Sequence, residues 1–300
     1  MQYVLKHMKY LKNILKQHIK KKKIKLNIYI IQMDDFLIGG TAGIVARTVT
    51  APIELFKLQR QNHYLKNNTI RYVLEKEGFR YLWKGNFTNC VRVFPQYGIS
   101  FATFQNTKPF YSNFTDNSNI VNFLSGGTAG VVSMCAIYPL ETSRTHLSLQ
   151  TNKSKYTGLL DVLTKLKFNQ LYAGLRMSIL GFGPWNAINF MSFFKYKEIF
   201  EPYKDNKHLY KLLCGGFAGI TALTVTYPSD LIRKRLQMQS FSSEVPQYNG
   251  IVDCATKIVK NEGIIGLYRG LWIGYIKCFP TLAVQFWTNE TIREFLGKEI

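Results

Sequence analysis

The sequence predicts an all-helical membrane protein made of three copies of a two-helix unit, with six spans in all. A segment of similar sequence recurs three times, and the copies lie at 39–59, 126–146 and 215–235. Each copy is followed by a polar connector and a second apolar stretch. Since every unit then holds two apolar stretches, three hairpins are the simplest arrangement for a repeat of this length.

The apolar stretches are about as long as a helix that crosses a bilayer. Three of them carry no charged residue, namely 121–139, 177–194 and 212–229. Three weaker ones contain charges well inside, namely 35–58, 86–107 and 270–289. A charge at that depth is costly unless it faces a partner or water, so these charges point to a functional role.

The composition indicates what the protein binds. The chain of 300 residues has a net charge of +21, with 39 basic against 18 acidic residues. This excess predicts an anionic partner, such as a lipid surface, a solute or nucleic acid. The hydrophobic content of 46% argues against a disordered basic protein. The five cysteines are odd in number and lack the C-x-x-C spacing, so we expect free thiols, no metal site and no cofactor.

Residues 1–33 form a separate basic extension with nine lysines and no acidic residue. We interpret this extension as a solvated, lysine-rich tail. The alternative is a segment that targets the chain or binds a lipid surface. The extension lacks the arginine and serine that are typical of a mitochondrial presequence.

A pair of glycines opens each copy, and it clears one helix face so that a neighbouring backbone can approach closely. The pairs are Gly39 and Gly43, Gly126 and Gly130, and Gly215 and Gly219. A proline follows each pair and should kink the span by removing a helix hydrogen bond. These prolines are Pro52, Pro139 and Pro228.

Just after each proline lies the pattern Pro-x-acid-x-x-base, in which the acid and the base share one helical face. Its charged residues are Glu54 and Lys57, Glu141 and Arg144, and Asp230 and Arg233. In a single helix this would be an ordinary surface ion pair. Three copies, each at the end of an apolar span, favour a ring of acids and bases that pair between helices and close a central cavity.

A second pattern ends the first and third units, where an acid-glycine pair precedes an aromatic-basic-glycine triplet. It reads Glu77-Gly78 and Trp83-Lys84-Gly85, then Glu262-Gly263 and Tyr268-Arg269-Gly270. The second unit keeps only Tyr172-Ala173-Gly174. In register over 35–295, the two patterns resemble the signature of the mitochondrial carrier family. On that resemblance the chain divides into the extension 1–33 and carrier repeats at 34–118, 119–207 and 208–300.

The resemblance implies a monomeric, multi-pass transporter of the mitochondrial inner membrane that works by alternating access. Its six tilted helices would surround a pseudo-threefold axis, with short helices on the matrix side and lipids such as cardiolipin bound to it. The matrix gate would consist of three pairs: Glu54 with Arg144, Glu141 with Arg233, and Asp230 with Lys57. Gln59 would hydrogen-bond across one of these pairs.

The cytoplasmic gate departs from the family pattern of aromatic-acid-x-x-base. Gln105 and Phe194 replace two of its acids, and Glu290 alone remains acidic. The matching cations are Lys108, Lys197 and Arg293. Three cations that face one acid repel each other, so we expect a weak gate and an easily populated cytoplasm-open state.

Cations within the spans mark the substrate site that the resemblance implies. Arg47, Arg92 and Lys277 should line a confined cavity, where they select a multiply charged anion. Two alternatives remain open at this point. Arg92 and Lys277 would instead extend to lipid headgroups, and Arg47 would instead support the matrix gate.

The helix that contains 177–194 supplies the uncharged part of the expected site. Gly181 leaves room for a flat group, against which Phe182 or Trp185 would stack. The alternative for both aromatic residues is ordinary packing between helices.

Finer similarity favours one group of substrates. The runs 85–101, 180–190 and 266–286 are similar to those of carriers for coenzyme A and adenine nucleotides, including the Graves-disease-type branch. We therefore expect a nucleotide-like anion, with thiamine pyrophosphate or another phosphorylated anion as the alternative. A nucleic-acid-binding protein would gather its charge on a soluble face, which this sequence does not predict. An enzyme would need a nucleophile–base pair or a metal cluster, and neither pattern recurs.

Replacement of Glu290 by glutamine is expected to favour the cytoplasm-open state further, because it removes the last carboxylate that faces the three cations. Transport kinetics in liposomes and the preference for state-specific inhibitors measure this shift. Unchanged kinetics together with an unchanged inhibitor preference would contradict the expectation.

Overall fold

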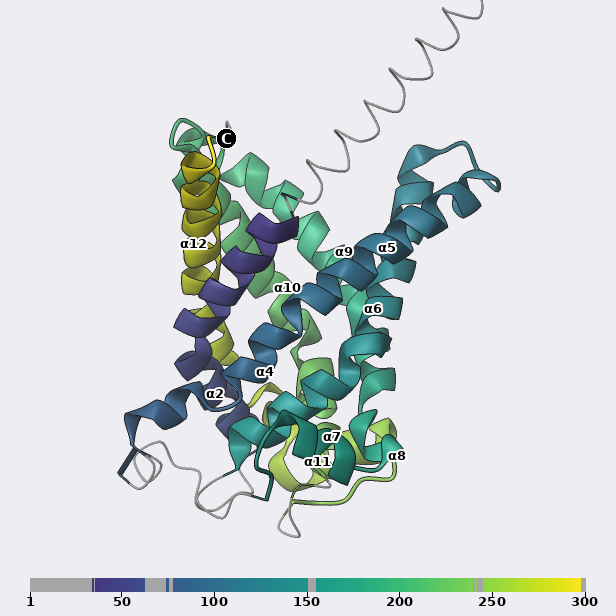
Figure 1. Cartoon of the computed structure of the whole chain (residues 1–300), viewed down its shortest axis with the longest axis vertical. Coiled ribbons are helices and arrows are strands. Elements are labelled where there is room, and N and C mark those ends of the chain that lie inside the picture. The colour runs from purple at the N-terminus through teal and green to yellow at the C-terminus, as the bar shows by residue number, and fades with distance from the viewer. Residues whose placement is uncertain are drawn as a thin grey trace, which may run out of the picture.

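The computed structural model describes residues 34, 36–62, 74–75, 78–150, 155–239, 241 and 245–297. The basic extension 1–33 and Glu77 lie outside these residues. The regular structure of the described part is helical throughout. Long helices rise side by side, short helices gather at one end, and the C-terminus lies at the other end (Figure 1).

The first unit starts with a helix at Phe36–Val49 and α2 (Ala51–Gln61), which meet at an angle of 62°. Pro52 lies in the first turn of α2, where a missing N–H costs least. The chain returns through the 3-10 helix η1 (Phe79–Trp83), α4 (Asn86–Val91) and α5 (Val93–Ser112).

The second and third units have the same plan with unbroken first helices. The second consists of α6 (Ser118–Leu149), the short α7 (Leu159–Lys165) and α8 (Phe168–Leu171), and α9 (Leu175–Ile199). After η2 (Glu201–Tyr203), the third consists of α10 (Lys207–Met238), α11 (Ile251–Glu262), η3 (Ile264–Tyr268) and α12 (Leu271–Phe295). Pro139 and Pro228 lie inside α6 and α10.

Two described helices are long and apolar enough to cross a membrane, at Ile120–Leu149 and Leu209–Met238. The bent pair of the first unit would make a third span. These are the first helices of the three units. The uncharged run 177–194 lies in α9, which does not reach the same hydropathy. Asn186 and Asn189 lower it, so absence of charge alone overstates how apolar this helix is.

Three glycines begin the second helices of the units in the left-handed conformation. They are Gly85, Gly174 and Gly270, with φ of 80°, 83° and 89°. A Cβ on the first two would lie 3.1 Å from the carbonyl oxygen of Arg144 and 2.9 Å from that of Arg233. On the third it would lie 3.6 Å from that of Lys57. Each second helix therefore starts against the first helix of the next unit, at a place that suits only glycine.

A buried ion pair fixes the end of α10 to the connector of the third unit. Arg235 is fully buried, and its Nη1 lies 2.9 Å from Glu262 Oε1. Arg269 Nη1 lies 3.3 Å from Glu262 Oε2. The second unit has no acidic residue equivalent to Glu262, and His146 stands at the position equivalent to Arg235. The Nε2 atom of His146 lies 3.0 Å from the carbonyl oxygen of Gln237.

Substitution of Arg235 by leucine should destabilise the protein strongly, because the Glu262 carboxylate would lose its buried partner. Removal of one member of a buried pair typically costs roughly 3–5 kcal/mol. The unfolding temperature of the purified protein measures the effect. Arg269→Leu is the control, since that side chain is 39% exposed and its loss should cost much less. An unfolding temperature of the Arg235 variant equal to that of the wild type would contradict the assignment.

Candidate functional site

The three Pro-x-acid-x-x-base segments meet at one place in the fold, on α2, α6 and α10. Their charged residues form the three pairs between helices that the family resemblance implies, and we call these residues the ion-pair ring. Arg144 Nη2 lies 3.6 Å from Glu54 Oε1, Arg233 Nη2 lies 2.7 Å from Glu141 Oε1, and Lys57 Nζ lies 2.7 Å from Asp230 Oδ2. Each side chain is at most 23% exposed, so removal of any partner leaves a charge poorly solvated.

Two of the predicted substrate-binding cations share the carboxylates of the ion-pair ring. Arg92, between α4 and α5, has its Nη1 2.8 Å from Glu141 Oε2. Lys277 of α12 contacts Glu54. Both side chains therefore point toward the ring, and neither extends to a headgroup region.

Two further cations reach the same space. Arg47 lines it, and its Nη1 is buried with no hydrogen-bond partner among the described residues. Lys234, which the sequence patterns did not single out, is 5% exposed and lies 3.1 Å from Glu141 Oε1. The only signal for it was a second base directly after Arg233.

The cavity at the ion-pair ring has a volume of about 120 Å³. In the described part of the chain, seven cations and three carboxylates line it. The space therefore carries four positive charges in excess. A confined, partly desolvated excess of this size attracts anions that bear several charges.

The expectation that Gln59 bridges an ion pair is wrong. Both polar atoms of its side chain are buried, and neither has a hydrogen-bond partner in the residues that the structure describes. Gln61 takes this role: its Nε2 lies 3.3 Å from Asp230 Oδ2 and 3.2 Å from the hydroxyl of Tyr227. Two residues turn a helix by about 200°, so Gln61 faces the pair and Gln59 does not.

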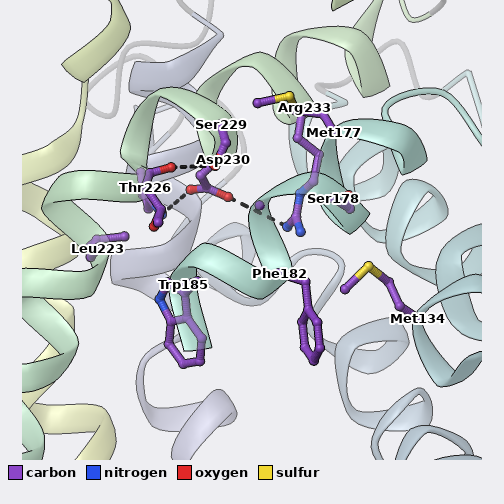
Figure 2. A pocket seen from close by; sticks show the side chains of 12 residues that line it. Met134, Met177, Ser178, Phe182, Trp185, Leu223, Thr226, Ser229, Asp230 and Arg233 are labelled. Carbon is purple, nitrogen blue, oxygen red and sulfur yellow. Dashed lines mark hydrogen bonds and ion pairs between the residues drawn. The ribbon is translucent and has the colours of Figure 1, made fainter. Parts of the chain in front are cut away.

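A second cavity, of about 260 Å³, opens beside the ring between α6, α9 and α10, and we call it the side cavity. Asp230 and Arg233 lie at one end of it, and Phe182 and Trp185 lie at the other (Figure 2). Lys57 also lines it, and its other walls are formed by Met134, Met177, Ser178, Gly181, Leu223, Thr226 and Ser229. The side cavity thus joins a charged end to walls of mixed apolar and hydroxyl side chains.

The two aromatic residues of α9 have different surroundings. Phe182 packs against α6, since a Cβ at Gly130 would lie 2.3 Å from its ring. The packing alternative therefore holds for Phe182, although its ring also lines the side cavity. Trp185 is 38% exposed and offers a ring surface to the cavity.

The residues predicted for the cytoplasmic gate lie toward the C-terminal ends of α5, α9 and α12. Lys108 and Lys197 lie over rings of their own helices, 5.7 Å from the centroid of Phe104 and 5.0 Å from that of Phe193. Arg293 Nε donates to Asn289 Oδ1 at 2.9 Å. Gln105 and Glu290 are half-buried. These lysines contact their own helices, whereas the members of the ion-pair ring pair between helices.

Comparison with known proteins shows the family to which the chain is similar. The chain matches the family model described as mitochondrial carrier protein three times, over 32–115, 115–204 and 204–300. It is 33% identical to human solute carrier family 25 member 16, over 87% of each chain. It is 32% identical to mitochondrial substrate carrier family protein P of Dictyostelium discoideum, over 88% of this chain and 94% of the relative. The mitochondrial adenine nucleotide transporter ADNT1 of Arabidopsis thaliana is 33% identical, over 87% of this chain and 86% of the relative.

Gln61→Ala is expected to weaken the pair of Lys57 with Asp230, because it removes a hydrogen bond to a charged group, which is typically worth roughly 1.5–3 kcal/mol. The unfolding temperature of the purified protein should fall accordingly. Gln59→Leu is the matched control, since it removes two buried polar atoms that have no partner and should be neutral or stabilising. Equal destabilisation by both substitutions would contradict the assignment.

Proposed function

Because this chain belongs to the mitochondrial carrier family, whose members are multi-pass transporters of the mitochondrial inner membrane, we propose that it carries a nucleotide-like anion across that membrane by alternating access. Coenzyme A or an adenine nucleotide is the favoured substrate. The observation that carries this proposal is the excess of four positive charges beside a side cavity that two aromatic rings line.

The charges at the ion-pair ring suit the phosphates of such a substrate. Arg47, Arg92 and Lys277 come from three separate segments of the chain and converge on one space. Arginine binds phosphate through charge-assisted hydrogen bonds, and several such groups around one cavity favour a ligand with more than one phosphate. Arg47 Nη1 has no hydrogen-bond partner in the described residues, so it is a cation that a phosphate would satisfy directly.

The side cavity suits the flat base of the same substrate. The ring of Trp185 would stack on a base while the phosphates remain near Arg233 (Figure 2). A Cβ at Gly181 would lie 2.9 Å from Ser229 Oγ, so this glycine lets α9 approach α10 closely beside the side cavity. The printed name of the Arabidopsis relative, an adenine nucleotide transporter, supports the same class of substrate.

The shared carboxylates suggest how binding and gating are linked. Arg92 and Lys277 pair with Glu141 and Glu54 in this conformation, in which the ion-pair ring is formed. A phosphate that takes over these two cations would remove one partner from each carboxylate and weaken the ring. Substrate would thereby favour opening on the matrix side, as alternating access requires.

A groove at the same end of the molecule is a candidate lipid site. It has a volume of about 500 Å³ and lies where α9 and α11 begin, and Gly174, Arg176, Gly250 and Asp253 line it. Helix N-termini with a nearby arginine attract lipid phosphates, so we propose that cardiolipin binds to this monomeric carrier.

Uptake by the purified protein in liposomes tests the proposal, with coenzyme A, ADP, ATP and thiamine pyrophosphate as substrates. Arg92→Gln and Lys277→Gln should each lower uptake of the preferred anion at least about tenfold, because each removes a charged hydrogen-bond donor. Lys195→Gln is the control, since Lys195 is 72% exposed and pairs with Glu198 of its own helix.

Two outcomes separate the parts of this proposal. Unaltered uptake in both Arg92 and Lys277 variants would refute the site assignment. Selective uptake of thiamine pyrophosphate would support the alternative substrate. The unfolding temperature without substrate reports damage to the ring itself, so that damage can be told apart from a loss of binding.

A further inference from the structure

The first helix of the first unit is broken near its proline, and the proline deprives one backbone carbonyl of its usual donor. The helix Phe36–Val49 and α2 meet at 62°, whereas α6 and α10 continue unbroken through Pro139 and Pro228. Pro52 has no N–H, so the carbonyl oxygen of Thr48, four residues earlier, cannot accept a hydrogen bond from it. A backbone carbonyl in this position needs a donor from elsewhere in the chain.

A side chain of the connector supplies that donor. The indole Nε1 of Trp83, the last residue of η1, donates to the carbonyl oxygen of Thr48 at 2.8 Å. Asn86 Nδ2 donates to the hydroxyl oxygen of the same threonine at 3.1 Å. These two donors flank Gly85, the left-handed glycine before α4. The start of the returning chain therefore binds both polar groups of one helix residue, and we call Thr48, Trp83 and Asn86 the indole latch.

The other two units join the same elements in the opposite direction. Tyr138 and Tyr227 stand directly before the prolines of these units. Their hydroxyls donate to carbonyl oxygens of the connector, that of Ala173 at 3.0 Å and that of Arg269 at 2.9 Å. The first unit has Ala51 at the equivalent position, and alanine has no such donor. In the first unit alone, a connector side chain thus binds the backbone of the first helix at the freed carbonyl.

The indole latch lies where it can set the position of α2 in the ion-pair ring. Thr48 follows Arg47, which lines the cavity at the ring, and it precedes the ring residues Glu54 and Lys57. Thr50 is the residue between the two helical segments. The angle at this break therefore determines where the ring residues of α2 lie relative to Arg47. Opening of the ring requires α2 to move, and the break is where such a movement costs fewest helix hydrogen bonds.

We propose that Trp83 is a positioning residue of the ion-pair ring: its indole holds the first helix bent while the ring is formed, and the latch is released when the ring opens. This inference rests on the alternating access of the proposed function and does not depend on the substrate. Loss of the indole N–H would leave the Thr48 carbonyl unpaired in the bent conformation. The loss should therefore shift the molecule toward the released conformation.

Cys90 is a native reporter of the latch, because its Sγ lies 3.7 Å from Thr48 Oγ1. The rate at which a small maleimide labels each cysteine of the purified protein is measured by peptide mass spectrometry. Trp83→Phe keeps an aromatic ring and removes the N–H, so it should raise the rate at Cys90 about fivefold, as expected for the loss of one hydrogen bond. The buried thiols of Cys214 and Cys254 should label at their original rates, which separates release of the latch from general unfolding.

A second substitution tests whether the indole acts through the freed carbonyl. Pro52→Ala restores a backbone N–H four residues after Thr48. In that background Trp83→Phe should change the rate at Cys90 by less than about twofold, because the carbonyl then has another donor. Trp287→Phe is the matched control, since Trp287 is 70% exposed on α12 and its loss should leave the rate at Cys90 unchanged. An undiminished effect of Trp83→Phe in the Pro52→Ala background would contradict this assignment.

A ring variant tests whether the latch and the ring are coupled. Asp230→Asn removes the charge that pairs with Lys57 of α2 and leaves every residue of the indole latch in place. It should raise the rate at Cys90 by at least about fivefold, because removal of one member of a buried pair costs more than the loss of one neutral hydrogen bond. A residue with a merely structural role at the break would not respond to a change in the ring.

Three outcomes would overturn the inference. An unchanged rate at Cys90 in Trp83→Phe shows that the indole does not hold the break. A rise in Trp83→Phe without a rise in Asp230→Asn assigns Trp83 a local structural role. Equal rises at all five cysteines in Trp83→Phe show that Trp83 stabilises the whole fold and positions no part of the ring. Labelling needs no substrate, so a protein that labels as expected but takes up no nucleotide-like anion refutes the proposed substrate and leaves this inference standing.

Discussion

The structure depends on one electrostatic constraint: three carboxylates hold together the ends of three helices that bring more cations than these acids can neutralise. Glu141 shows the constraint most clearly, because Arg92, Arg233 and Lys234 all lie within 3.1 Å of its carboxylate. Buried charges are tolerated only when they are paired. The ring therefore joins three helices and also carries an excess of positive charge, and both properties belong to the same side chains.

The three units have the same residue at equivalent positions where the backbone conformation requires it, and they differ at other positions. The left-handed glycines occur in all three units. The Arg235–Glu262 pair of the third unit is replaced in the second by His146 on a carbonyl oxygen.

The sequence was enough to predict the repeat, the helical class and the acid and base that share one face in each unit, because each depends on spacing along one segment. Which acid pairs with which base came from the family resemblance and not from the spacing. The sequence failed where the outcome depended on rotation or on contacts between helices. The pattern did not show that Gln61 and not Gln59 faces Asp230, nor that Lys234 turns inward to Glu141. The packing of Phe182 on Gly130 depends on how α6 and α9 cross, which no single segment encodes.

The left-handed glycines also tie the motions of the units together. A Cβ at Gly85 would meet the carbonyl oxygen of Arg144, and one at Gly174 would meet that of Arg233. The start of each second helix thus lies close to the backbone of a residue of the ion-pair ring from the neighbouring unit. A shift of one ring residue should therefore displace the adjoining hairpin, which carries ring residues of its own. We therefore expect the three hairpins to move together. Conformations in which only one or two of them have moved should then be rare, and the transport cycle should proceed in concerted steps.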